Sequence, residues 1–254
     1  MSPPTETISV IIPCHNYGRF VEEAVRSVDA QTRPVDQIVI CDDGSSDDSW
    51  GTIQRLAAER SNVATIRHEH AWGLVATLNQ LWRTSEGRLI VPLSADDRLG
   101  PGYLDAMAAA VFDQGWDFAY TDMQCFGSEN WRFIAPEFDI DRLARFNYIH
   151  GSSGLTRDCL EAVGGYQPTF ERGFEDYDFW LSVLEHGFEG GKAEGVHLEY
   201  RRHEQGSRNT ASISDRLRLR YKLFRHHPRF FLHPRTLRAW LPSNRPIAGV
   251  EAPP

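Results

Sequence analysis

Short apolar runs alternate along the chain with segments in which apolar residues recur every three or four positions. The apolar runs are rich in β-branched residues, which is typical of strands buried on both faces of a sheet. The predicted strands are residues 7–13, 37–41, 64–67, 88–93 and 117–124. The helical spacing predicts helices over residues 20–28, 50–60, 73–84 and 103–112. This repeated order predicts an α/β domain with a mostly parallel sheet and helices on both faces.

Polar residues follow several of these strands directly. His15 and Asn16 come after the first strand, an acidic turn at 42–48 after the second, and residues 94–97 after the fourth. The carboxyl ends of parallel strands meet at one edge of a sheet, and ligands of such sheets bind in the crevice there. The sequence therefore predicts a binding site at that edge.

The length and composition fit one catalytic domain with a short extension. The 254 residues are 41% apolar and 24% charged, which supplies a substantial core. We assign residues 1–215 to the catalytic domain and 216–254 to a basic, amphipathic extension. That extension holds nine Lys and Arg residues against one acid, Glu251, whereas the whole chain carries a net charge of -8. An acidic body argues against general nucleic-acid binding.

Neither a signal peptide nor a membrane span is evident in the sequence. The four cysteines lie far apart, without the spacing of a zinc knuckle or redox motif, and are expected to be reduced buried thiols. We therefore expect a cytoplasmic protein. Aromatic and aliphatic residues among the basic residues of the extension favour contact with the inner face of an anionic membrane. The alternative is that the extension packs on the acidic body or binds a protein partner.

Asp42 and Asp43 follow a buried strand, and Gly44 allows a sharp turn there. Carboxylates at a strand end can accept hydrogen bonds from the N–H or hydroxyl groups of a ligand. The alternative is an acidic cap for the next helix, which explains Asp47 and Asp48 better.

Asp96 and Asp97 repeat this arrangement after the fourth strand. Adjacent carboxylates that face a crevice repel each other unless a cation lies beside them, and their hard oxygens suit Mg²⁺ or Mn²⁺. Such a metal stabilises a diphosphate leaving group. Paired acids are also common on protein surfaces, so the pair alone leaves both interpretations open.

A third acidic pair, Glu175 and Asp176, is flanked by aromatic residues, which would exclude water and make a carboxylate more basic. The alternative is a pair of acids favoured by the N-terminus of a helix. His203 lies in a polar segment and can supply an imidazole ligand to a metal. A surface histidine without a special role is the alternative there.

Taken together and in order, these segments resemble the family 2 glycosyltransferases of the GT-A fold. The resemblance covers residues 7 to 210. It is carried by Ser-Val-Ile-Ile-Pro-Cys-His-Asn at 9–16, Val-Ile-Cys-Asp-Asp-Gly-Ser-Ser-Asp at 39–47, Gly73 with Asn79, Leu-Ser-Ala-Asp-Asp at 93–97, Val-Gly-Gly-Tyr at 163–166, Glu-Asp-Tyr-Asp-Phe-Trp at 175–180 and Tyr-Arg-Arg-His at 200–203.

This resemblance implies an inverting transfer of a sugar from a nucleotide diphosphate donor, with a UDP-sugar favoured, to an acceptor hydroxyl. The acceptor would be a saccharide or a lipid-linked saccharide in the synthesis of cell-surface polysaccharide or glycoconjugate. Asp176 would be the catalytic base and Asp97 the ligand of Mn²⁺ or Mg²⁺, with His203 a second ligand. Residues assigned to the donor are Pro13, His15, Asn16, Asp43, Asn79 and Asp96, and those assigned to the acceptor are His150, Glu175 and Trp180.

Three rival functions are compared with this interpretation. A nucleotidyltransferase also uses metal-binding acids, but it usually has a glycine-rich phosphate loop where this chain has Cys-His-Asn-Tyr-Gly-Arg. A dinucleotide-dependent dehydrogenase is disfavoured because Gly-x-Gly-x-x-Gly is absent. A binding module without catalytic activity would have lost the metal ligand or the base, yet Asp97 and Asp176 are both present.

Overall fold

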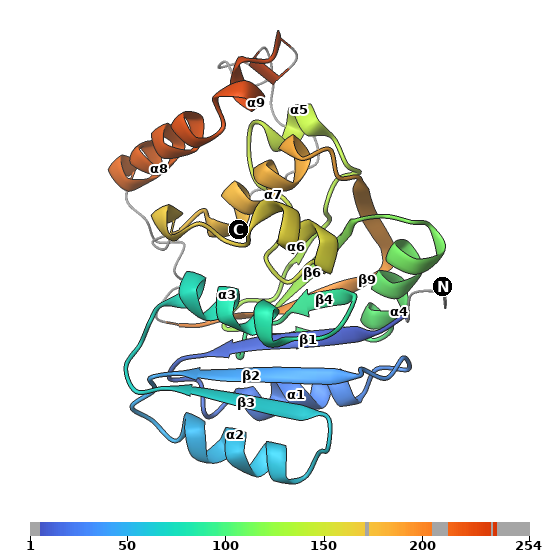
Figure 1. Cartoon of the computed structure of the whole chain (residues 1–254), viewed down its shortest axis with the longest axis vertical. Helices are drawn as coiled ribbons and strands as arrows, with labels where there is room; N and C mark the ends of the chain where they lie inside the picture. Colours follow the sequence, from blue (N-terminus) through green and yellow to red (C-terminus); the bar gives the residue numbers. More distant parts are fainter. Residues whose placement is uncertain (1–5, 171–172, 205–212, 235, 238–254) are drawn as a thin grey trace.

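A computed structural model describes residues 6–170, 173–204, 213–234 and 236–237 (Figure 1). Its strands are β1 Ile8–Cys14, β2 Gln37–Asp43, β3 Val63–His68, β4 Leu89–Pro92, β5 Arg98–Leu99, β6 Phe118–Gly127, β7 Arg132–Phe133, β8 Gly154–Thr156 and β9 Gly190–Arg202. Its helices are α1 Val21–Asp29, α2 Ser49–Ala58, α3 Leu74–Thr84, α4 Tyr103–Ala108, α5 Ile140–Leu143, α6 Arg157–Val163, α7 Glu175–Glu185, α8 Ile213–His226 and α9 Pro228–Leu232, with a π-helical turn Ala109–Asp113 and a 3₁₀ turn Pro168–Phe170.

The described strands join in one mixed sheet. Eight of them have the order β3-β2-β1-β4-β8-β6-β9-β5, and β7 pairs with the outer part of β6. The ladders β3-β2, β2-β1, β1-β4 and β6-β9 are parallel and long, whereas each antiparallel ladder joins only two residue pairs. The predicted α/β class with a largely parallel sheet is therefore confirmed.

Helices cover both faces of this sheet, as Figure 1 shows. Successive residues of a strand point to opposite faces, so Ile11 and Val39 pack beneath α3, while Val10 and Ile38 pack against α1 and α2. The two apolar layers are both fully buried at these positions. Burial on both faces explains why the strands read as nearly continuous apolar runs.

The structure extends one predicted strand and adds elements that the sequence analysis did not assign. β2 extends to Asp43, so its last two residues, Asp42 and Asp43, belong to the strand and point to opposite faces of the sheet. Residues 126–150, to which the sequence analysis assigned no helix or strand, contain the end of β6, the short strand β7 and helix α5. Hydrophobic periodicity cannot detect elements as short as β7 and α5.

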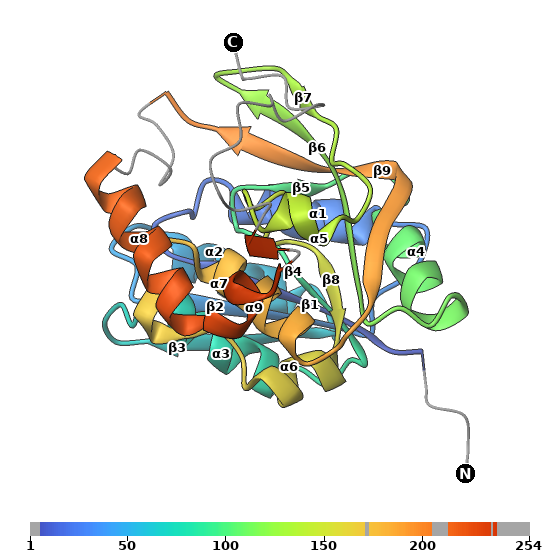
Figure 2. The same ribbon diagram turned by 90° about the horizontal axis from the view of Figure 1, so that it is seen from above.

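The described part of the basic extension packs on the catalytic domain. Leu219 and Leu223 of α8 and Phe230 and Phe231 of α9 are buried in the apolar layer that also contains α7. Figure 2, viewed from above, likewise places α8 and α9 beside α7. Other basic and aromatic residues of the extension, Arg235, Arg238, Trp240 and Arg245, lie outside the described residues, as does Glu251.

Within the described ranges, no helix is both long enough and apolar enough to cross a membrane.

Candidate active site

Asn16 ties the loop after β1 to the loop after β2. It adopts a left-handed backbone conformation (φ 58°), which asparagine tolerates better than most residues. Its Oδ1 accepts hydrogen bonds from the backbone N–H groups of Ser46 (2.8 Å) and Asp47 (3.4 Å), and its own N–H donates to the Ser45 hydroxyl (2.9 Å). One side chain therefore fixes two strand-end loops at the predicted ligand edge.

His15 is held in a defined orientation beside these loops. Its Nδ1 lies 2.7 Å from the carbonyl oxygen of Asp43, and a carbonyl only accepts, so Nδ1 donates. Its Nε2 lies 3.1 Å from Nδ2 of Asn16. His15 and Asn16 are exposed, and Pro13 at the end of β1 is partly buried. Their predicted roles in donor binding remain predictions.

Asp43 is buried, and protein groups donate to its carboxylate. Oδ1 accepts from the N–H of Trp72 (2.7 Å) and lies 2.7 Å from Nδ1 of His68, while Oδ2 accepts from the N–H of Gly73 (3.0 Å). Burial works to raise the pKa of Asp43, but these hydrogen bonds outweigh it and lower the pKa below its usual value. A charged Asp43 thus fixes the turn that precedes α3.

Trp72 is the exposed aromatic residue of that turn. Its ring stacks on the buried His68 with centroids 3.9 Å apart and an interplanar angle of 15°. The residue remains 54% exposed. A flat aromatic surface therefore stands open to solvent directly beside Asp43.

The end of β9 brings His203 to the two acids that follow β4. β5 pairs antiparallel with β9, so residues just before β5 lie opposite the last residues of β9. Accordingly, the N–H of Arg201 donates to Oδ1 of Asp97 (2.8 Å), and Nε2 of His203 lies 2.7 Å from Oδ2 of Asp96. The structure thus brings together Asp96, Asp97 and His203, which the sequence prediction assigned to one site.

The two acids differ in their exposure to solvent. Asp97 is 2% exposed, whereas the side chain of Asp96 is 13% exposed. Burial raises the pKa of Asp97 well above its usual value, and the neighbouring charge of Asp96 acts in the same direction. A cation beside the pair removes this penalty, and carboxylate and imidazole are ligands that Mn²⁺ accepts. The carboxylate of Asp96 and the imidazole of His203 lie side by side here, and both are ligand types for the divalent metal that the resemblance implies.

Arg201 fastens this corner of the site. Its Nε donates to the carbonyl oxygen of Asp96 (2.8 Å), and its guanidinium pairs with Glu23 of α1 at 2.6 Å. The same group lies 4.4 Å from the ring centroids of Phe20 and Phe126. The sequence analysis assigned no role to Arg201, because its partners come from distant segments. Its place beside His203 in Tyr-Arg-Arg-His was the only signal.

Asp176 lies in the first turn of α7, directly after a left-handed residue, Phe174 (φ 67°), and Glu175. Its Oδ1 accepts from the N–H of Tyr177 (2.7 Å), and its Oδ2 accepts from Nδ2 of Asn147 (2.9 Å). Burial, and secondarily the charge of Glu175, raises the pKa of Asp176 to about 7. Such a carboxylate is a stronger base than an ordinary aspartate.

Strand pairing places Asp176 at the same edge as Asp96 and Asp97. β8 runs antiparallel to β4, with Ile90 opposite Leu155, so the segment just before β8 lies at the carboxyl end of β4. Within that segment, Asn147 bonds Asp176, and the Cβ position of Gly151 is 3.9 Å from Cβ of Asp176. The sequence analysis did not identify Asn147, which lies in a segment without readable periodicity.

His150 belongs to the same segment. Its Nε2 lies 3.1 Å from the hydroxyl of Thr121, and burial lowers the pKa of His150 to about 4. Nδ1 is buried and has no hydrogen-bond partner among the described residues. The predicted contact of His150 with an acceptor remains a prediction, as does that of Glu175.

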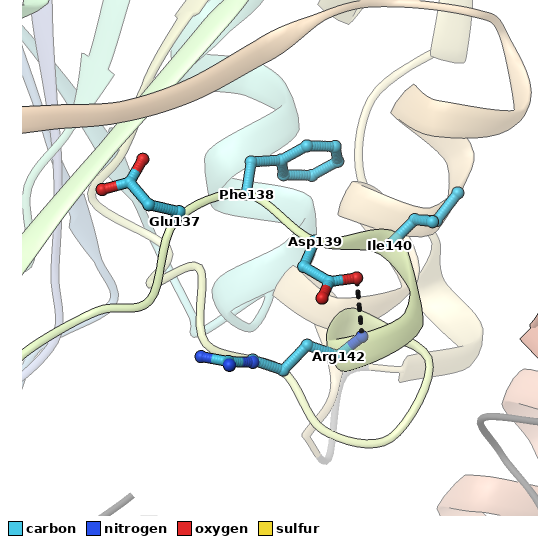
Figure 3. Close-up of a pocket in the computed structure, with 5 residues that line it drawn as sticks. All are labelled: Glu137, Phe138, Asp139, Ile140 and Arg142. Carbon is cyan, nitrogen blue, oxygen red and sulfur yellow. Dashed lines mark hydrogen bonds between the residues drawn. The ribbon is translucent and has the colours of Figure 1, made fainter. Parts of the chain in front are cut away.

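A pocket of about 660 Å³ opens beside α5 (Figure 3). Glu137, Phe138, Asp139, Ile140 and Arg142 line it. Asp139 caps α5 by accepting from the N–H groups of residues 141 and 142. Its own backbone N–H donates to the hydroxyl of Tyr148 (2.8 Å), which follows Asn147 directly, so this wall is joined to the segment that bonds the predicted base.

One predicted site residue needs correction, and a second has a structural role as well. Trp180, assigned to the acceptor, is 1% exposed and packs against Phe118 and Phe179 in the core. A side chain enclosed in this way offers no face to an acceptor. Asn79, assigned to the donor, is partly buried; its Nδ2 donates to the carbonyl of Tyr166 (2.7 Å), its Oδ1 accepts from the N–H of Tyr166 (2.9 Å), and its role in donor binding remains a prediction. Asn79 therefore joins α3 to the turn at 164–166.

Comparisons with known proteins concern the family and the fold of this chain. The sequence profile described as Glycosyl transferase family 2 matches residues 9–177. UDP-Glc:alpha-D-GlcNAc-diphosphoundecaprenol beta-1,3-glucosyltransferase WfaP of Escherichia coli is 25% identical over 209 residues, which are 78% of this chain and 78% of WfaP.

Among solved structures, S. aureus TarS 1-349 in complex with UDP-GlcNAc superposes with a TM-score of 0.75 at 16% identity, over 89% of this chain and 67% of that one. The mannosyltransferase PcManGT from Pyrobaculum calidifontis, in complex with GDP-Man and Mn²⁺, has a TM-score of 0.64 at 18% identity, over 91% of this chain and 71% of that one. These likenesses concern the fold. With the family profile covering most of the residues from β1 to the first turn of α7, this chain belongs to glycosyl transferase family 2.

Proposed function

We propose that this glycosyltransferase uses Asp176 to deprotonate an acceptor hydroxyl, which displaces a nucleoside diphosphate from a sugar donor with inversion at the anomeric carbon. The observation that carries the proposal is topological. The β4–β8 pairing gathers Asp176 and the Asp96–Asp97 pair at one edge of the sheet. A base and a metal-binding pair at one edge are what a single in-line displacement requires.

The donor nucleotide is proposed to bind at the ends of β1 and β2. His15 and Asn16 are exposed there on loops that hydrogen bonds hold in place. Trp72 adds an open aromatic face beside Asp43, on which a nucleobase can stack. A uridine base is favoured, since WfaP is named for UDP-Glc and TarS was solved with UDP-GlcNAc.

Asp96, Asp97 and His203 are proposed to hold Mn²⁺ or Mg²⁺. A bound divalent cation would neutralise the diphosphate and stabilise it as the leaving group. The protein contributes a fixed ligand set: Arg201 anchors both the backbone of Asp96 and the carboxylate of Asp97. Support from a relative is the Mn²⁺ in PcManGT.

The acceptor is proposed to be a lipid-linked saccharide of cell-surface polysaccharide synthesis. The pocket beside α5 combines apolar faces from Phe138 and Ile140 with polar groups from Glu137, Asp139 and Arg142. Saccharides are recognised by this mixture of packing and hydrogen bonding. WfaP is named for an acceptor carried on diphosphoundecaprenol, which supports a lipid carrier here.

A lipid-linked acceptor also gives the exposed side of α8 a role. Leu217 and Tyr221 are 63% and 62% exposed and lie one helical turn apart, while Arg218, Lys222 and Arg225 are exposed around them. Apolar residues among basic ones are suited to an anionic membrane surface. The buried side of α8 packs on α7, and the exposed side is free to contact a membrane. The helix can therefore make both contacts at the same time.

A screen of nucleotide sugars tests the proposed reaction. Purified protein is incubated with each donor and Mn²⁺, with and without a lipid-linked saccharide, and released nucleoside diphosphate is measured. We expect one donor class to give release that the acceptor accelerates and that Asp176→Asn suppresses. Tight donor binding without release by the wild type would instead identify a binding module without catalytic activity.

A further inference from the structure

Two histidines at the junction of α8 and α9 converge on a buried aspartate of α7, a helix that Figures 1 and 2 both show beside them. Nδ1 of His226 lies 2.6 Å and Nε2 of His227 lies 2.9 Å from the same oxygen, Oδ1 of Asp178. One ligand atom from each of the three residues lies within 4.8 Å of the others. This is a convergence of three potential metal ligands far along the sequence from Asp96 and Asp97.

Asp178 is not satisfied by these contacts. It is fully buried, and its second oxygen, Oδ2, has no hydrogen-bond partner among the described residues. Buried carboxylate oxygens are normally hydrogen-bonded or bound to a metal, because an unpaired one loses its hydration without compensation. The side chain therefore has a coordination position to spare inside the protein.

A second carboxylate orients one of the imidazoles. Glu185, two turns further along α7 than Asp178, accepts a hydrogen bond from Nδ1 of His227 at 2.8 Å. This directs Nε2 of His227 towards Asp178. Metal-bound histidines characteristically donate their other ring N–H to a carboxylate in this way, which fixes the ring and strengthens it as a ligand.

We propose that Asp178, His226 and His227 bind a zinc-type divalent transition metal, which fastens α8 and α9 to α7. Two imidazole nitrogens and one carboxylate oxygen match the three-ligand sets of tetrahedral zinc sites. His226 has a side chain that is 41% exposed, which leaves an entry path and a fourth position for water. Ligand atoms around zinc at ~2.1 Å stand roughly 3.4 Å apart, so small rotations of the imidazoles open the site.

A proton is the competing occupant of this cluster. Burial lowers the pKa of His227, but hydrogen bonds to Asp178 and Glu185 outweigh burial and raise it to about 9. A hydrogen-bonded ion cluster without metal would hold α8 and α9 as well. The two cases differ in whether zinc binds, and that difference can be measured without any sugar donor.

The test compares zinc binding by the full chain with zinc binding by its His226→Gln variant. Both proteins are first freed of metal by chelation and dialysis, and zinc binding is then measured by calorimetry in competition with a chelator. His226 is the exposed ligand, so its loss leaves the buried contacts of His227 intact. We expect one Zn²⁺ in the wild type that binds at least ~100-fold more tightly than in the variant. Because Asp96 and His203 are unchanged in both proteins, any zinc bound there contributes equally. Bound Zn²⁺ should also raise the melting temperature of the wild type by more than it raises that of the variant.

Two further variants make the result specific. Glu185→Gln should weaken zinc binding ~10- to 100-fold while the visible spectrum of the Co²⁺-substituted site stays that of the wild type. His186→Gln removes an exposed histidine of the neighbouring turn and should bind zinc as the wild type does. Equal zinc affinity and stoichiometry in the wild type and His226→Gln would overturn the proposal, as would a wild type that binds no zinc.

Discussion

Nδ2 of Asn147 donates a hydrogen bond of 2.9 Å to Oδ2 of Asp176, and this contact joins the segment before β8 to the first turn of α7. The bond orients one carboxylate oxygen, while the N–H of Tyr177 holds the other. Because the segment that carries Asn147 lies at the carboxyl end of β4, the contact also fixes the proposed base at the edge that carries Asp96 and Asp97, the proposed metal ligands.

The first prediction concerns this base. Asp176→Asn keeps the shape of the side chain and removes its basic oxygen, so turnover should fall ~10²- to 10⁴-fold, or roughly 3 to 5 kcal/mol of barrier. Donor and Mn²⁺ affinities should stay near those of the wild type. Steady-state transfer assays with calorimetric donor binding measure both. Asp113→Asn, the same change at an exposed site, is the control. If Asp176→Asn retained nearly full transfer activity, Asp176 would not be the catalytic base.

The second prediction concerns the divalent metal. Chelation should abolish transfer, and added Mn²⁺ should restore it, because the diphosphate cannot approach Asp96 and Asp97 without a cation. Asp97→Asn should weaken Mn²⁺ binding, followed by electron paramagnetic resonance, by ~10-fold or more. The exposed Asp158→Asn serves as the control. Transfer that persists in chelator, or unchanged Mn²⁺ binding by Asp97→Asn, would contradict this assignment.

The sequence alone was sufficient to predict the alternating strands and helices of the first half of the chain. Strands buried on both faces leave continuous apolar runs, so β1, β2 and β4, and the polar residues at their ends, were predicted from local pattern alone. The contact between Asp96 and His203 could not be predicted from local pattern in this way. They are 107 positions apart, and only the family resemblance grouped them before the β5–β9 pairing was seen.

What the sequence did not predict depends on tertiary packing. Trp180 was assigned to the acceptor, but α7 lies between the sheet and α8 and is buried on both sides. A helix enclosed in this way shows little amphipathic contrast. Asn147 and Arg201 act through partners in other elements. The sequence contained no signal for the contact of Asn147, and for Arg201 only its place in the Tyr-Arg-Arg-His motif.

The third prediction concerns recognition of the nucleobase. Trp72→Ala removes the exposed ring beside Asp43, so the donor KM should rise ~5- to 100-fold, in keeping with ~1–3 kcal/mol for one stacked base. The value of kcat should change little, because the ring is remote from bond breaking in this scheme. Trp72→Phe should recover most of the affinity. An unchanged donor KM in Trp72→Ala would show that the base binds elsewhere.

The fourth prediction concerns membrane contact through α8. Deleting the extension would expose the core, because Leu219 and Leu223 are buried, so surface substitutions make the better test. The double variant Leu217→Ser and Tyr221→Ser should float with anionic vesicles about 10-fold less than the wild type, since even partial burial of two such side chains contributes ~1.5 kcal/mol or more.

Binding of the wild type to these vesicles should weaken as the salt concentration rises, because basic residues attract the anionic surface only within a Debye length. Ile134→Ser, at a 53% exposed position away from α8, is the matched control. Equal flotation of the wild type and the double variant, or equal binding to neutral vesicles, would rule out this surface as the membrane contact.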